Sequence, residues 1–261
     1  MATDLEDKPT ARSAAHAIGT FRKDRWWLQP AITASVLTAF VVYGSWVAFI
    51  GRDYYVEPYL SPFYSPCIAS ICDHLTFKLV GDWWKLSPAL LILPFPMTFR
   101  LTCYYYRKAY YRSFYLSPPA CAVKEPHRSY SGETRFPLIL QNIHRYSFYA
   151  ALPFPIILGY DAVLAFNFPD GFGMGVGTLV LTINAILLGI YTVSCHSCRH
   201  LCGGHVNTFS KAPLRYRAWK IVTKLNQRHM GLAWVSLVWV ALSDVYVRLL
   251  ATGNLTDLRF F

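Results

Sequence analysis

Charged residues are scarce in this chain. Asp, Glu, Lys and Arg make up only 15% of its 261 residues, whereas a typical soluble domain carries about 25%. Hydrophobic residues reach 54%, and aromatic residues alone account for 16%. A soluble fold could not bury this much apolar surface, but a lipid bilayer accommodates it. The composition therefore excludes an ordinary soluble domain and predicts a membrane protein.

Several familiar sequence signals are also missing. The chain has no phosphate-binding P-loop, no glycine pattern of a dinucleotide-binding fold and no setting for a serine triad. Residues 1–26 are polar and lack the short apolar stretch of a cleavable signal peptide, so we expect the first apolar segment to be a full span. The seven cysteines are an odd number, which does not fit a complete disulfide framework.

Five apolar segments are long enough to cross a bilayer, whose core of about 30 Å takes about 20 helical residues. They are Leu28–Ile50, Leu86–Tyr106, Tyr146–Phe168, Phe172–Cys195 and Met230–Leu250. The proline pairs Pro94/Pro96 and Pro153/Pro155 predict kinks in the second and third spans. We therefore expect an all-α integral membrane protein built as a five-transmembrane-helix bundle.

Basic residues lie mainly in alternate connections between these spans. Residues 1–27, the connection after the second span and the one after the fourth together hold eighteen Lys and Arg, against five on the other side. Because basic residues stay in the cytoplasm, we expect the N-terminus inside and the C-terminus outside. Residues 1–27 then form a cytoplasmic basic segment, 28–250 the transmembrane domain and 251–261 an outer tail. This topology explains the net charge of +11 without nucleic acid and is compatible with docking of a cytoplasmic partner.

The expected outer side carries three features of its own. Cys67 and Cys72 face an oxidising compartment, where a disulfide and two free thiols are equally good interpretations. The stretch Asn167–Phe172 predicts a tight turn between the third and fourth spans. Gly173 and Gly177 are spaced for close packing at the start of the fourth span, which we interpret as a packing face.

Two acidic residues, Asp161 and Asp244, fall inside predicted spans, near their outer ends. Acids within the membrane are candidates for a functional role. Arg248, however, follows Asp244 by one helical turn, the spacing of an i,i+4 ion pair. We therefore favour structural pairing over a proton path.

Cysteine and histidine recur at the inner ends of four spans. Cys103 lies at the inner end of the second span and His144 at the inner start of the third. A cluster beginning at Cys195 lies at the inner end of the fourth span, and His229 lies at the inner start of the fifth. Side chains on facing helices at one depth are how helical bundles build cofactor sites. Two Cys with two His suit a Rieske-type [2Fe–2S] cluster or a structural zinc, and two His alone suit a b-type haem.

The cluster at the end of the fourth span reads S-C-H-S-C-R-H-L-C-G-G-H, from Ser194 to His205. Its pair Cys195 and Cys198 is a C-x-x-C motif, which is only moderately specific without a second copy. The motifs C-R-H and C-G-G-H resemble a Rieske signature. They are almost adjacent in the sequence, however, whereas the two ligand loops of a Rieske cluster usually come from separate segments. The pattern alone leaves the metal open.

Three stretches resemble a known family. They are L-T-C-Y-Y-Y-R-K-A-Y-Y-R-S-F followed by P-P-A-C-A-V, then G-E-T-R-F-P-L-I-L-Q-N-I-H-R-Y, and Y-T-V-S-C-H-S-C-R-H with R-H-M and A-W-V-S-L. They are similar to the single membrane anchor of an actinobacterial class of succinate dehydrogenase, from about Arg25 to the C-terminal D-L-R-F-F. The resemblance implies a multi-pass protein of the bacterial plasma membrane, with a flavoprotein and an iron–sulfur subunit docked on its cytoplasmic face and quinone as electron acceptor.

The resemblance also implies a cofactor and the residues that bind it. A Rieske-type [2Fe–2S] cluster within the membrane would be held by Cys103, His144, Cys198 and His229, with Cys195 as the substitute for Cys198. Candidates for the quinone pocket are Trp27, Arg100, Tyr104, Arg145 and Tyr146. The two arginines are also candidates for offsetting the charge of the cluster.

Three other interpretations remain open. A b-haem anchor would use His144 and His229 as axial ligands, and a purely structural anchor would hold zinc or no metal at its cysteines. A small transporter is disfavoured because the first and fourth spans contain no Asp, Glu, Lys or Arg. The chain has no flavin site, so we do not expect it to oxidise succinate by itself.

Overall fold

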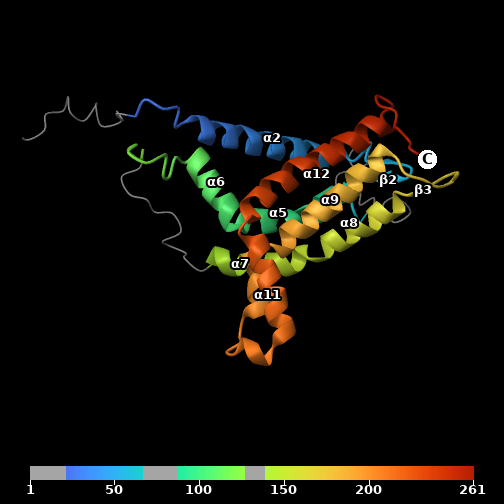
Figure 1. Cartoon of the computed structure of the whole chain (residues 1–261). Helices are drawn as coiled ribbons and strands as arrows, with labels where there is room; N and C mark the ends of the chain where they lie inside the picture. Colours follow the sequence, from blue (N-terminus) through green and yellow to red (C-terminus); the bar gives the residue numbers. More distant parts are fainter. Residues whose placement is uncertain (1–21, 67–86, 127–138) are drawn as a thin grey trace, which may run out of the picture. The chain divides into compact units, whose positions relative to one another are not determined.

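A computed structural model of the chain describes residues 22–66, 87–126 and 139–261 (Figure 1). These residues form helices and two small antiparallel hairpins. They divide into two compact units, one made of residues 22–39 with 107–126 and the other of residues 40–66, 87–106 and 139–261. In the smaller unit, the guanidinium of Arg22 pairs with Asp24 and donates to the carbonyl of Cys121 over 2.8 Å. The larger unit holds the buried Cys and His side chains of the candidate site described below.

The helices and strands follow one another closely along the chain. The helices are α2 (Leu28–Ile50), α4 (Pro88–Ile92), α5 (Pro94–Thr102), α6 (Tyr104–Phe114), α7 (Ile139–Ala151), α8 (Pro153–Leu164), α9 (Val176–Val193), α10 (His196–Gly203), the 3₁₀ turn η2 (Phe209–Lys211), α11 (Pro213–Asn226) and α12 (His229–Ala251). The strands are β1 (Tyr55–Val56) paired with β2 (Tyr59–Leu60), and β3 (Asn167–Phe168) paired with β4 (Gly171–Phe172).

Four of the predicted spans are present as helices long and apolar enough to cross a membrane. They are α2, the pair α7–α8, α9 and α12. The bounds of α2 agree with the prediction, and α12 is one residue longer at each end. The third span begins seven residues earlier than predicted, at Ile139, and His144 lies within α7. In the described residues the second span is divided among α4, α5 and α6, so the count of five spans stays a prediction.

The predicted kinks fall at the two proline pairs. Helix α4 ends at Ile92 just before Pro94, and α7 ends at Ala151 just before Pro153. Proline lacks an amide hydrogen and its ring collides with the preceding turn, which interrupts a helix at such a position. A further break, at Cys103, has no proline: its backbone is extended (φ −64°, ψ 132°) and separates α5 from α6. The sequence analysis did not predict this break.

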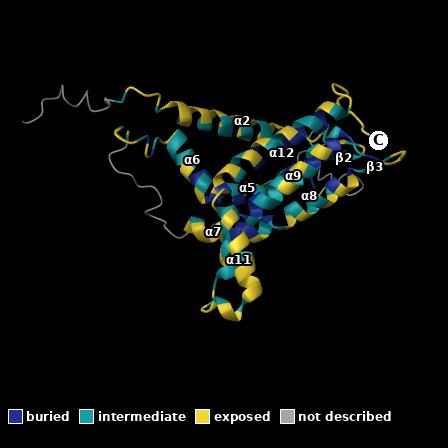
Figure 2. Ribbon diagram, viewed as in Figure 1, coloured by how far each residue is buried: buried dark blue, intermediate teal, exposed yellow. Residues whose placement is uncertain are grey.

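Helix α9 lies at the centre of the larger unit, packed against α8 and α12, while α5 packs against α7 and α10 against α11. In Figure 2 buried residues gather where α5, α7 and α9 meet, and the outward faces of α8 and α12 are exposed. Those outward faces are apolar: Ile156 and Val163 on α8 are 72% and 67% exposed. An exposed apolar surface of this kind is suited to lipid rather than to water.

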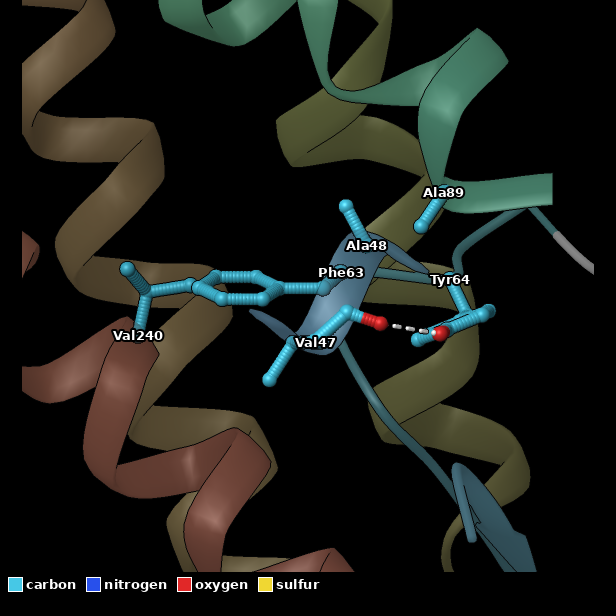
Figure 3. Packing of buried hydrophobic residues seen from close by; sticks show 6 residues of the cluster. All are labelled: Val47, Ala48, Phe63, Tyr64, Ala89 and Val240. Atoms are coloured by element: carbon cyan, nitrogen blue, oxygen red, sulfur yellow. Dashed lines mark hydrogen bonds between the residues drawn. The ribbon is translucent and has the colours of Figure 1, made fainter. Parts of the chain in front are cut away.

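An apolar cluster joins the last turns of α2 to the chain that follows it (Figure 3). Phe63 reaches toward Val240 of α12, and Ala89 of α4 packs on the same cluster. The hydroxyl of Tyr64 donates to the carbonyl of Val47 over 2.6 Å. The segment after α2 is therefore folded back onto the helices.

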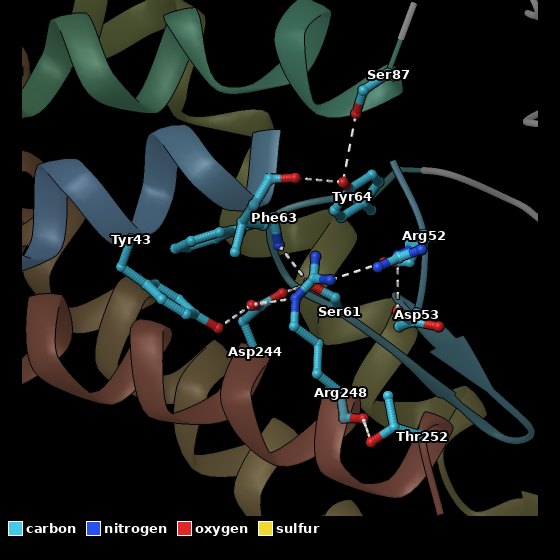
Figure 4. Close-up of polar contacts among 11 residues, drawn as sticks. Tyr43, Arg52, Asp53, Ser61, Phe63, Tyr64, Ser87, Asp244, Arg248 and Thr252 are labelled. Atoms are coloured by element: carbon cyan, nitrogen blue, oxygen red, sulfur yellow. Dashed lines mark hydrogen bonds and ion pairs between the residues drawn. The ribbon is translucent and has the colours of Figure 1, made fainter. Parts of the chain in front are cut away.

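A buried ion pair lies beside this cluster (Figure 4). Arg248 donates to the carboxylate of Asp244 over 2.8 Å, which is the i,i+4 pair expected from the sequence. The same carboxylate accepts hydrogen bonds from Tyr43 of α2 and from Ser61. Arg248 also donates to the carbonyl of Arg52 over 2.7 Å. The ion pair thus connects α12 to α2 and to the segment that follows α2, which is a structural role.

The other acid inside a predicted span is also paired. The carboxylate of Asp161 on α8 accepts a hydrogen bond from the hydroxyl of Ser65. Cys67 and Cys72 lie outside the described residues, so their pairing stays a prediction.

The predicted turn between the third and fourth spans is the β3–β4 hairpin, whose Gly171 has φ +127°. Close packing at Gly177 is also present, but its partner is a ring and not a helix. A β-carbon at Gly177 would lie 2.5 Å from the ring of Tyr59. The glycine therefore makes room for the β1–β2 hairpin at the start of α9.

Candidate functional site

Four of the predicted ligands form two buried pairs. The sulfur of Cys103 lies 3.5 Å from Nε2 of His229, and the sulfur of Cys195 lies 3.0 Å from Nε2 of His144. None of these four side chains is more than 8% exposed. Each pair joins one residue from the α5–α7 half of the site to one from the α9–α12 half, so the pairs cross between the halves.

A hydroxyl group fixes each imidazole from the opposite side of its ring. Thr102 donates to the carbonyl of Thr98 over 2.7 Å, so its oxygen accepts from Nδ1 of His144 at 3.0 Å. Ser194 likewise donates to the carbonyl of Tyr191 over 2.7 Å and accepts from Nδ1 of His229 at 2.6 Å. With the proton on Nδ1, the lone pair is on Nε2, the atom that faces sulfur. Both histidines therefore have the tautomer that a metal requires.

An aromatic ring covers a face of each imidazole. Phe99 is parallel to His144 within 8° at 5.0 Å, and Tyr191 is parallel to His229 within 12° at 5.1 Å. Phe99 and Tyr191 are themselves 5.6 Å apart, centroid to centroid. The two Cys–His pairs are thus the two ends of a row of four rings, called the ring stack below, in which Phe99 and Tyr191 are tilted by 60° to each other.

The same five-residue pattern builds both halves of the site. F-R-L-T-C (Phe99–Cys103) and Y-T-V-S-C (Tyr191–Cys195) each supply a stacking ring, a hydroxyl and a cysteine. Both cysteines stand at a break between helices with extended backbone, φ −64° and ψ 132° at Cys103 and φ −68° and ψ 150° at Cys195. The repeated Cys and His were recognised in the sequence, but the stacking ring and the hydroxyl of each half were not, although the five-residue repeat could have revealed them.

The donor atoms, two sulfurs and two Nε2 lone pairs, are those of a mixed Cys/His cluster. Among the described residues, however, no three His, Cys, Asp or Glu side chains converge as a ready metal site. What the chain provides is two separate pairs, linked through the ring stack.

Cys198, the other candidate on the fourth segment, has a different setting. It is half-buried on α10 and has a side-chain interaction with the thiol of Cys202 rather than with a histidine. Burial, with a smaller contribution from Cys202, raises the pKa of the Cys198 thiol to about 11. Its neighbour His196 stacks on Tyr105, and burial together with Arg199 lowers the pKa of this histidine. The structure therefore brings Cys195, and not Cys198, to the histidines.

The candidates for the quinone pocket lie in different surroundings. Trp27, Tyr104 and Tyr146 are 53%, 56% and 75% exposed, and Arg145 is also exposed. Arg100 is half-buried and contacts Tyr106, Tyr191 and α12. A quinone site is not defined by these positions, and its assignment stays a prediction.

Fold and site together define a helical multi-pass membrane protein with a buried, pseudo-symmetric set of Cys and His side chains. Residues 28–253 match the family described as actinobacterial succinate dehydrogenase subunit SdhC, and the chain belongs to that family. The resemblance stated from the sequence is thus confirmed. The chain is a succinate dehydrogenase membrane anchor of the multi-pass type, from the plasma membrane of a bacterium.

Among solved structures, the chain is similar to one in the Mycobacterium smegmatis Sdh1 complex in the apo form. The two are 54% identical with a TM-score of 0.81, over 93% of this chain and 94% of that one. No curated protein sequence gives a significant match to this chain.

Proposed function

We propose that this chain anchors a succinate dehydrogenase in the membrane and carries electrons from its soluble iron–sulfur subunit to quinone. Family membership supports a complex with a flavoprotein and an iron–sulfur subunit. The basic inner segments suit docking of those subunits on the cytoplasmic face. Five spans, with the N-terminus inside and the C-terminus outside, complete the proposal.

The crossed Cys–His pairs are the observation that carries the electron-transfer role. We infer that Cys103, His144, Cys195 and His229 hold a Rieske-type [2Fe–2S] cluster. Cys195 replaces Cys198 in this set because Cys195 is buried and lies against His144. Such a group supplies one-electron transfer at a potential above that of an all-cysteine cluster.

The chain's own residues prepare this site. Thr102 and Ser194 keep the proton on Nδ1 of their histidines, which leaves Nε2 free for a metal. Phe99 and Tyr191 cover the imidazole faces and exclude water. Asn226 donates to the carbonyl of Ser194 over 2.8 Å, which fixes the break after α9 against the start of α12.

A b-type haem is the second candidate cofactor. It would bind Nε2 of His144 and of His229 on opposite faces of one iron. In the structure each of these atoms faces a sulfur instead, which favours the cluster. A purely structural anchor is the third candidate, and it predicts no redox-active metal.

The test is electron paramagnetic resonance, paired with a visible spectrum, on the purified complex before and after dithionite reduction. We expect a Rieske-type signal that is absent in His144→Ala and in His229→Ala, while the clusters of the soluble subunit persist. A haem spectrum lost in the same variants would replace the cofactor. Neither signal, in a complex with its other clusters intact, would leave this chain as a structural anchor.

The choice of cysteine has its own matched pair of variants. Cys195→Ser is expected to abolish the Rieske-type signal, because a buried ligand is lost. Cys198→Ser, three residues away on α10, is expected to retain it. The reverse result would move the ligand to Cys198 and overturn the assignment made from the structure.

A further inference from the structure

Arg100 is a cation inside the membrane part of the chain, next to the candidate site. Its guanidinium donates to the hydroxyl of Tyr106, to Oγ of Ser236 over 3.2 Å and to the carbonyl of Ala233 over 3.4 Å. All of these acceptors are neutral. Among the described residues no carboxylate lies within ion-pair distance of it.

A cation within the membrane is costly, and it usually pairs with an acidic group or with backbone carbonyls. Arg248, a buried arginine elsewhere in the larger unit, pairs with Asp244 over 2.8 Å. The hydrogen-bond acceptors of Arg100 are all neutral. The described residues therefore leave the charge of Arg100 without a counter-charge.

The geometry links Arg100 directly to that site. The amide of Cys103 donates to the carbonyl of Arg100 over 3.1 Å, so the two residues share the last turn of α5. The guanidinium lies 4.6 Å from the centroid of the Tyr191 ring, the ring that also stacks on His229. Arg100 thus contacts one member of the ring stack and adjoins one of the cysteines.

Arg100 also breaks the internal repeat of the site. In F-R-L-T-C it occupies the position that Thr192 holds in Y-T-V-S-C. Every other contributing position is matched in kind: ring with ring, hydroxyl with hydroxyl, cysteine with cysteine. Arg100 therefore marks the position at which the two halves differ in charge.

We propose that Arg100 is the counter-charge of the metal cluster and sets its reduction potential as a positioning residue. This inference rests on the proposed function, because it needs the two cysteines to be thiolates on a metal. Reduction adds negative charge to the cluster, and a nearby cation stabilises that charge. Arg100 accordingly raises the potential and favours accepting an electron from the soluble subunit.

The size of the effect follows from Coulomb's law. A unit charge within about 10 Å, at an effective dielectric constant of about 20, changes the ratio of reduced to oxidised cluster on the order of tenfold. Arg100→Gln is therefore expected to shift the midpoint potential to a more negative value, by the amount that corresponds to this tenfold change in the ratio of reduced to oxidised cluster. Arg100→Lys keeps the charge and is expected to retain most of the native potential.

The experiment is a redox titration of the Rieske-type signal in the purified complex, followed by paramagnetic resonance. Arg217→Gln on α11 is the control, because Arg217 is exposed and its charge is screened by solvent. Ser236→Asp is a second test that retains Arg100. It places a carboxylate where Oγ now accepts from the guanidinium, and by neutralising the cation it should lower the potential as Arg100→Gln does.

The possible outcomes separate the two proposals. A native complex without any Rieske-type signal overturns the proposed function, and this inference with it. A native signal whose potential is unchanged in Arg100→Gln and in Ser236→Asp overturns only the role of Arg100. A shift as large in Arg100→Lys as in Arg100→Gln would show that packing, and not charge, is responsible.

Discussion

Each histidine of the site is held between a hydroxyl and a sulfur, and the hydroxyl decides which nitrogen is available. Thr102 illustrates this, because its own hydrogen is committed to the carbonyl of Thr98. Its oxygen can then only accept, which keeps the proton of His144 on Nδ1. Thr102 thus determines which nitrogen of His144 faces the sulfur of Cys195.

Replacing this hydroxyl gives a prediction at the same scale. Thr102→Val keeps the shape of the side chain but removes the acceptor, so His144 is free to take the other tautomer or to turn. Loss of such an outer partner typically costs about 10–100-fold in metal affinity. We expect less of the Rieske-type signal per complex, measured against the clusters of the soluble subunit.

Thr98→Val is the matched control on the same helix. Thr98 is exposed, and its hydroxyl donates only to the carbonyl of Phe95 over 3.0 Å. This variant should retain the full signal. Equal occupancy in Thr102→Val and Thr98→Val would show that the hydrogen bond to His144 does not matter for cofactor binding.

The sequence reveals the residue types of the site better than their partners. The Cys and His at the ends of four spans pointed to one depth, and in the structure Cys103 lies against His229. The sequence left the choice between Cys195 and Cys198 open, because both fall on one face if the helix is continuous. The extended backbone at Cys195 ends the helix before Cys198 and so separates the two cysteines. The local sequence contains no proline or other residue that would predict this break.

At the scale of elements, the start of α9 depends on a residue without a side chain. The ring of Tyr59 occupies the space that a β-carbon of Gly177 would need, at 2.5 Å. Gly177→Ala must therefore displace a buried ring, and such overpacking costs about 1–3 kcal/mol. We expect a lower thermal denaturation midpoint of the purified complex.

Gly231→Ala provides the comparison in another helix. A β-carbon at Gly231 in α12 would meet nothing within 4 Å. Alanine in a helix is favoured over glycine by about 0.5–1 kcal/mol, so the midpoint should stay or rise. If both variants lowered the midpoint equally, close packing at Gly177 would not explain the effect.

The ion pair between Asp244 and Arg248 connects α12 to α2 and to the segment between α2 and α4. Asp244→Asn removes the charge that balances a buried arginine, and breaking such a pair costs about 3–5 kcal/mol. Asp170→Asn breaks the exposed pair with Arg259, which water already screens. In thermal denaturation we expect a clear loss of stability for the first variant and none for the second. If Asp244→Asn lost no more stability than Asp170→Asn, the charge of Asp244 would not be needed, and its hydrogen bonds with Tyr43 and Ser61 would suffice to hold α12 in place.

At the scale of the whole molecule, hydropathy predicted the positions of four spans well. Breaks within the spans were predicted only where a proline pair marks them. Helix α2 has the predicted bounds because its 23 residues contain no charge and no break. The third span begins at Ile139 rather than at Tyr146, because the polar residues of Q-N-I-H-R-Y lower the hydropathy there although they form the first turns of α7. The second span is divided at Cys103, where the backbone is extended although no proline marks the break.

The number of spans is the property of the whole molecule with the most direct test, because it decides on which side each end lies. Eighteen basic residues in alternate connections against five predict five spans, with the N-terminus in the cytoplasm and the C-terminus outside. Alkaline phosphatase, which is active only outside, should therefore be active when fused after Phe261 and inactive when fused after Gly204, beyond α10. A fluorescent protein that folds only in the cytoplasm should give the reverse pattern.

If the second, divided span did not cross the membrane, the four remaining spans would place both ends on one side. A C-terminal fusion that is active with a cytoplasmic N-terminus requires an odd number of crossings, so these two fusions decide between five spans and four.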